Sequence, residues 1–291
     1  AVRANLVAAA TSIVMIGGVR VGLVRRTRFG ARCEEAVETL FHALPPSARK
    51  RLIIVDAGIA TQERFAAATE QDALVGRLRI NCKLRCAPPP PSGTRGHPTW
   101  HGPVLHPGAP LPEVDPDEEC TRPGDKGEVR VRRWNALHFE ETRHTSFDVL
   151  RIDDPAYKRP LVVGTTAREL TTDEFLQAYP HRWPVETNFF VAQDTAAMEM
   201  PRAWTAKALE RRISLSLLSG SLLQAIAAAT GPLAMGPWDR KPRPSAGRLA
   251  NYLEGHAAHF SALALKGVEP RNYRIIHEHA SINELQQPKA A

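Results

Sequence analysis

The sequence predicts an α/β fold, because segments with the periodicity of strands alternate with segments of helical periodicity. The continuous apolar run Leu52–Val55 is typical of a strand buried on both faces of a sheet. A short helical segment, Gln62–Glu70, follows this run, and Ala73–Ile80 has the composition of a further strand. The 291 residues suffice for one sizeable core with an appendage, or for two small domains.

Two strands are predicted at the N-terminus, over Ser12–Ile16 and Val19–Val24, with a pair of glycines between them as the turn. A signal peptide is the alternative for the apolar stretch Ala4–Val19. This stretch is too short to cross a bilayer as a helix, and its β-branched residues favour the strand. Glu34–Leu44 then has helical spacing, and two prolines after it end the helix.

The middle of the chain is predicted to be an insertion, because 11 of the 24 prolines fall within residues 87–126. A compact core cannot use so many prolines, so part of this insertion should be a loop. Strand-like segments follow, and they indicate that the rest of the insertion is a small β-sheet: Glu128–Val131, His138–Glu140, Phe147–Ile152 and Leu161–Gly164.

The last third is predicted to be helical. Thr171 and Glu174 have the spacing of a capping box, which should begin a short helix that runs to Tyr179. Further helices are expected over 183–198, 205–229 and 249–265. These patterns divide the chain into an N-terminal part of the core (1–86), the insertion (87–160), a C-terminal part of the core (161–230) and a helical tail (231–291).

The charge balance favours a polyanionic partner. The formal charge is +7, the sequence pI is about 9.5, and residues 1–33 contain arginines but no Asp or Glu. Such an excess suits nucleic acid or an anionic membrane surface. Four scattered cysteines do not make a disulfide scaffold, and reduced thiols in a cytoplasmic protein are the expectation.

Two places in the sequence have residues suited to chemistry. Asp56 lies at the carboxyl end of a predicted strand, where open α/β sheets place ligand sites, and a carboxylate there suits a hard divalent cation. Tyr179, Arg182 and Glu186 are spaced by three and four residues at the start of a helix. The alternatives are a turn-capping aspartate at Asp56 and a surface ion pair between Arg182 and Glu186.

This second segment resembles the Y-x2-R-x3-E-x6-K signature of bacterial insertion-sequence transposases of the DDE type. The match covers Tyr179, Arg182 and Glu186, and Trp183 after the arginine is also typical. The signature departs from the family at Gln193, where Lys or Arg is usual. The resemblance extends upstream to the segments 52–58 and 76–81, which look like the region of the family's second acidic residue.

The resemblance implies an RNase H-like core in which Asp56 is the second catalytic acid and Glu186 the third. It implies two Mg²⁺ or Mn²⁺ ions for DNA cleavage and strand transfer, with Asp56 and Glu186 as metal ligands. The residues that it assigns to DNA binding are Tyr179, Arg182, Trp183, Arg77 and Arg79.

The implied partners are transposon ends and target DNA, with a possible homodimer, no membrane, and a place in the cytoplasm at the nucleoid. No acid precedes Glu34, so the first catalytic Asp is expected on a strand upstream of Ala1, and the chain is expected to be a fragment. A catalytically inactive DNA-binding remnant and an RNase H-like nuclease are the alternatives.

Overall fold

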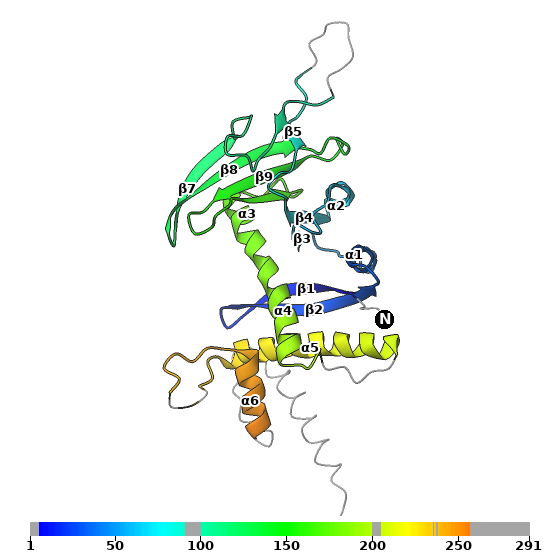
Figure 1. Cartoon of the computed structure of the whole chain (residues 1–291), viewed down its shortest axis with the longest axis vertical. Helices are drawn as coiled ribbons and strands as arrows, with labels where there is room; N and C mark the ends of the chain where they lie inside the picture. Colours follow the sequence, from blue (N-terminus) through cyan, green and yellow to red (C-terminus); the bar gives the residue numbers. More distant parts are fainter. Residues whose placement is uncertain (1–5, 91–99, 200–204, 235, 237, 257–291) are drawn as a thin grey trace, which may run out of the picture. The chain divides into compact units, whose positions relative to one another are not determined.

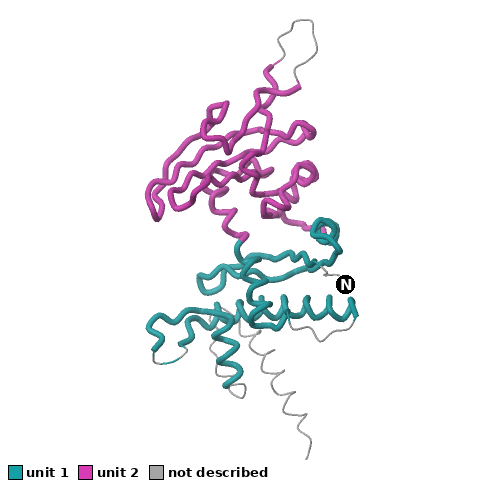
Figure 2. The backbone as a smooth tube through the Cα atoms, viewed as in Figure 1, with its two compact units in different colours: residues 1–44, 183–291 teal, residues 45–182 magenta. Residues whose placement is uncertain are grey.

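The computed structural model describes residues 6–90, 100–199, 205–234, 236 and 238–256, and the chain divides into two compact units (Figure 2). Unit 1 comprises residues 1–44 and 183–291, and unit 2 comprises residues 45–182. The predicted α/β class is confirmed, since a mixed six-stranded sheet and several helices are present (Figure 1). The division differs from the four predicted segments, because the N-terminal strands pack with helices from the end of the chain.

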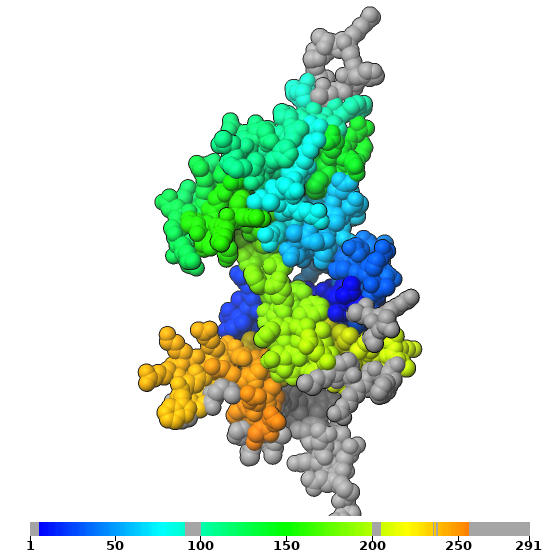
Figure 3. Space-filling model, viewed as in Figure 1, coloured from blue at the N-terminus to red at the C-terminus, as the bar shows by residue number. Residues whose placement is uncertain are grey.

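The six-stranded sheet of unit 2 has the order β3-β4-β10-β9-β8-β7. Its strands are β3 (Arg51–Val55), β4 (Asp72–Arg77), β10 (Leu161–Thr165), β9 (Phe147–Asp153), β8 (Gly127–Leu137) and β7 (Glu118–Gly124). β3 and β4 are parallel, and every other neighbouring pair is antiparallel. Strands β7, β8 and β9 lie side by side and form a continuous surface (Figure 3). A separate pair joins β5 (Leu84–Arg85) to β6 (Val104–Leu105).

Three sequence-based expectations about this sheet are wrong. The strands after the proline-rich segment do not form a small sheet of their own, because β10 pairs with β4 on one side and with β9 on the other. β3 is not buried on both faces: Val55 is buried, but Leu52 is 37% exposed. The physical reason is that β3 is an edge strand. The predicted strand at 138–140 reduces to one isolated bridge between His138 and Arg85.

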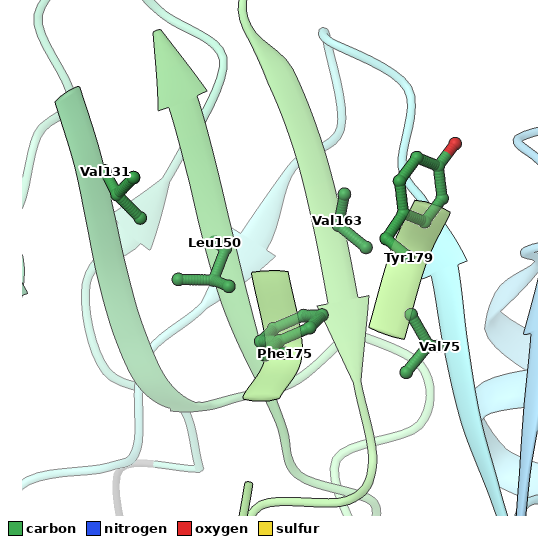
Figure 4. Packing of buried hydrophobic residues seen from close by; sticks show 6 residues of the cluster. All are labelled: Val75, Val131, Leu150, Val163, Phe175 and Tyr179. Atoms are coloured by element: carbon green, nitrogen blue, oxygen red, sulfur yellow. The ribbon is translucent and has the colours of Figure 1, made fainter. Parts of the chain in front are cut away.

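The core of unit 2 lies between the sheet and the helix α3 (Thr172–Ala178). Figure 4 shows six of its side chains, from four strands, from α3 and from the 3₁₀ turn η1 (Tyr179–Arg182): Val75, Val131, Leu150, Val163, Phe175 and Tyr179. The capping box is confirmed, since Thr171 accepts from the Glu174 N–H and Glu174 accepts from the Thr171 N–H. Helix α2 (Gln62–Ala67) places Phe65 against Phe147, with ring centroids 4.5 Å apart.

Unit 1 is built on the hairpin of β1 (Leu6–Ile16) and β2 (Val19–Gly30), as predicted but with longer strands. Gly17 and Gly18 make the turn with φ of +55° and +78°, a conformation that glycine adopts without strain. Helix α1 (Cys33–His42) packs on both strands.

Three more helices lie in the described part of unit 1: α4 (Trp183–Asp194), α5 (Ala206–Thr230) and α6 (Ala246–His256). The buried Asn188 of α4 donates to the carbonyl oxygen of Gly22 at 2.8 Å and accepts from Gln224 of α5 at 2.6 Å, which ties both helices to the hairpin. The part of the last predicted helix beyond residue 256 lies outside the described residues. By length and composition α5 could also cross a membrane, but buried helices of soluble proteins pass that test as well.

Candidate functional site

Asp56 follows β3 directly, at the edge of the sheet where the parallel strands β3 and β4 end. Its backbone carbonyl accepts from the N–H groups of Ile59 and Ala60, so the chain turns sharply at this point. The Asp56 side chain is 49% exposed, and its Oδ2 lies 3.6 Å from Nη1 of Arg182. This separation is within the range of an ion pair but is too long for a good hydrogen bond.

The other carboxylate oxygen of Asp56 can still accept a hydrogen bond or bind a cation. Oδ1 is buried and makes no hydrogen bond to any residue that the structure describes. A buried carboxylate oxygen without a partner loses the solvation of its charge, and a cation bound beside it would restore that stabilisation. Asp56 therefore meets what one ligand of a hard divalent cation requires.

Tyr179 and Arg182 reach Asp56 from the turn η1, which packs against β3. The Tyr179 ring is in the core, and in Figure 4 its hydroxyl points away from the other five labelled side chains. Burial raises the pKa of Tyr179, the charge of Asp56 raises it further, and Arg182 and Arg77 lower it. The hydroxyl is therefore protonated at neutral pH and is a hydrogen-bond donor.

The Arg182 side chain is fixed by its surroundings. Its guanidinium carbon lies 5.8 Å from the centroid of the Tyr179 ring, within the range of a cation–π contact, and the side chain is 14% exposed. The ring and Asp56 together hold this cation at the end of β3. The structure thus brings together Asp56, Tyr179 and Arg182, three residues that the sequence singled out in separate segments.

Trp183 and Glu186 belong to the other unit. Trp183 is the first residue of α4 and is 59% exposed, and Glu186 is exposed in the first turn, where a carboxylate is favoured by the helix dipole. The unit boundary falls between Arg182 and Trp183, so it passes through the signature. Proximity of Glu186 to Asp56 stays a prediction.

Arg77 and Arg79 lie at the end of β4 and line a pocket of about 320 Å³ in unit 2. Ala57, next to Asp56, also lines this pocket, as do Asn81, Arg159 and Pro160. Sequence reasoning missed Arg159, because nothing in the loop between β9 and β10 distinguishes it from the other arginines. Only the fold brings this loop to the end of β4.

Sequence reasoning also missed a pair of histidines. Nδ1 of His101 lies 3.0 Å from Nε2 of His138, and the rings are stacked with centroids 5.3 Å apart. His138 is buried, and its pKa is lowered by burial and by the charges of His101 and Arg85. Within the described residues no group of three or more His, Cys, Asp or Glu side chains could hold a metal ion. The two rings are thus in hydrogen-bonding contact with each other.

No known family model matches the sequence, and a comparison with curated proteins gave no match.

Proposed function

We propose that this chain is a DDE-type transposase, or a fragment of one, with an RNase H-like core that acts on DNA phosphodiesters. The observation that carries the proposal is the cluster of Asp56, Tyr179 and Arg182 at the end of β3. These residues come from two distant segments of the sequence, and each has the chemical type that the resemblance requires at its position. Together they join a candidate metal ligand to two donors suited to a phosphate.

The roles of the side chains follow from their chemistry. Asp56 and Glu186 would hold divalent ions, which when bound supply the positive charge that phosphodiester cleavage and strand transfer require. Arg182 presents a planar fork that matches two oxygens of a phosphate, and the Tyr179 hydroxyl can donate beside it. The ion pair with Asp56 keeps Arg182 in place before DNA arrives. The buried ring of Tyr179 likewise keeps the turn η1 in place.

Iron-directed cleavage of the protein backbone tests the metal assignment without needing enzymatic activity. Fe²⁺ occupies oxygen-rich Mg²⁺ sites, and with ascorbate and peroxide it produces radicals that cut the nearest polypeptide. We expect cuts beside Asp56 and beside Glu186, both suppressed by excess Mg²⁺. Both cuts should disappear in Asp56→Asn and in Glu186→Gln.

Asp173→Asn is the matched control. Asp173 is an exposed acid in the first turn of α3, paired with Arg122, so its loss should leave the cuts unchanged. Cuts that persist in Asp56→Asn would refute the role of Asp56. A cut beside Asp56 but none beside Glu186 would refute a shared metal site.

A DNA-binding remnant without catalysis is the second candidate, and the contact between Asp56 and Arg182 favours it. A guanidinium 3.6 Å from the carboxylate is also the arrangement of a purely structural ion pair. In that case Asp56→Asn would lower protein stability, but it would not alter the cleavage pattern with iron.

A further inference from the structure

The pocket at the end of β4 has arginines from two segments, none of them in an ion pair with a described acid, and it lies next to the turn at Asp56. Arg77 is the last residue of β4 and Arg79 follows two residues later, and both side chains line the pocket. Leu78, between them, is 4% exposed and points into the core, and its N–H donates to the carbonyl oxygen of Val162 at 2.8 Å. The backbone between the two arginines is therefore tied to β10 at Leu78.

Arg159 reaches the same pocket through the pairing of β10 with β4. The two strands are antiparallel, with Val163 opposite Arg77. The residues before β10 therefore pass the residues that follow β4, and Arg159 and Pro160 complete the wall of the pocket. Pro160 restricts the backbone of the residue before it, Arg159, which lies in a bend ahead of β10.

No acid in the described residues of unit 2 pairs with any of these three arginines. Arg77, Arg79 and Arg159 are exposed, and none of them forms an ion pair with an acid in the part of the chain that the structure describes. Arginines elsewhere on the same sheet do have such partners. Arg130 pairs with Glu119, Arg132 with Asp153, and Arg133 with Asp148.

We propose that this pocket binds a phosphate group of a DNA strand, with Arg159 as a contact beside Arg77 and Arg79. That the polyanion is DNA rests on the proposed function. The location of the binding site and the role of Arg159 are additions to it. Guanidinium groups recognise phosphate oxygens through two parallel hydrogen bonds, and three of them around one concave site suit a single phosphodiester group. Because Ala57 lines the pocket, a phosphate bound there lies beside the turn that begins at Asp56.

The test is the affinity of the full chain for a short fluorescein-labelled DNA duplex, measured by fluorescence anisotropy over a series of salt concentrations. We expect Arg159→Gln to weaken binding about tenfold at low salt and to reduce the slope of log K against log salt by about 0.9, the value for one lost phosphate contact. Arg130→Gln removes the same charge from an exposed, acid-paired position and should change the affinity less than about twofold. Circular dichroism confirms that both variants are folded.

Equal losses of duplex affinity in Arg159→Gln and Arg130→Gln would overturn the proposal, since the change in net charge alone would then explain both losses. Tight binding of inorganic phosphate that depends on Arg159, with duplex affinity independent of it, would also overturn the proposal, because the ligand would be free phosphate. The result is separable from the metal test. Arg159→Gln should leave the iron-directed cuts intact, whereas Asp56→Asn abolishes them and keeps the three arginines.

Discussion

Asp148 is the centre of a buried charge network that joins the six-stranded sheet to the segment leading into α3. Its side chain is 3% exposed, and it accepts from Arg133 at 2.7 Å, from Arg168 at 3.2 Å and from the N–H of Ala136 at 3.0 Å. Arg133, buried as well, also donates to the carbonyl oxygen of Leu170 at 2.9 Å. The network therefore positions the start of α3, whose other end leads into the turn that carries Tyr179 and Arg182.

Replacing Asp148 by Ala should lower the free energy of unfolding of unit 2 by about 3–5 kcal/mol, because Arg133 would stay buried without its carboxylate. With a urea dependence of roughly 2 kcal/mol per molar, the midpoint of unfolding should fall by about 2 M. Circular dichroism during a urea titration measures this shift. Asp173→Ala, which breaks the exposed pair with Arg122, should cost no more than about 1 kcal/mol.

The double variant Asp148→Leu with Arg133→Met separates charge from packing. Removing both charges should recover a large part of the unfolding free energy that Asp148→Ala loses, because a buried ion pair is often no more stabilising than apolar residues of similar size. A loss below about 1 kcal/mol in Asp148→Ala would refute the reasoning. So would a double variant whose loss equals the sum of the two single losses.

Two more predictions concern acid stability and activity. The pKa of His138 is lower in the folded protein than in the unfolded chain, so stability is fully present above about pH 6.5, the unfolded pKa, and is lost as the pH falls through the lower folded pKa. Thermal melting should therefore show a steeper loss of stability on acidification in the wild type than in His138→Gln. Parallel melting curves for the two proteins would contradict this. The purified chain should not nick supercoiled plasmid in Mg²⁺ or Mn²⁺, because Asp56 and Glu186 supply only two of the three carboxylates that the resemblance implies. Nicking that disappears in both Asp56→Ala and Glu186→Ala would show that two acids suffice.

Prediction from the sequence succeeded for elements that have local signals, and it failed where a strand pairs with a segment far away in the chain. The turn at Gly17 and the capping box at Thr171 are read from neighbouring residues, and both are confirmed. β7 was not predicted, because Pro123 and Gly124 near its end suggest a loop, although the strand pairs with β8 up to Gly124. The edge position of β3 and the pairing of β10 with β4 depend on contacts between distant segments, which no local pattern encodes.

The candidate site illustrates the same limit. Asp56 and Arg182 were each identified from the residues around them, as a strand-end acid and as part of a spaced signature. Their ion pair was not predicted, because it requires the turn η1 to pack against β3. Periodicity indicates which residues form a strand, but it does not indicate which helix or turn covers the end of that strand.

The basic composition of the chain likewise does not locate a site for a polyanion. On the six-stranded sheet, most of the arginines are neutralised by acids on neighbouring strands, as Arg132 is by Asp153. Such pairs depend on strand order and register, so a count of charges along the sequence cannot identify them. The arginines that line the pocket have no such acid partner among the described residues, and Arg159 joins Arg77 and Arg79 through the fold alone. The gathering of these three arginines beside the turn at Asp56 is thus a property of the sheet pairing rather than of the net charge of +7.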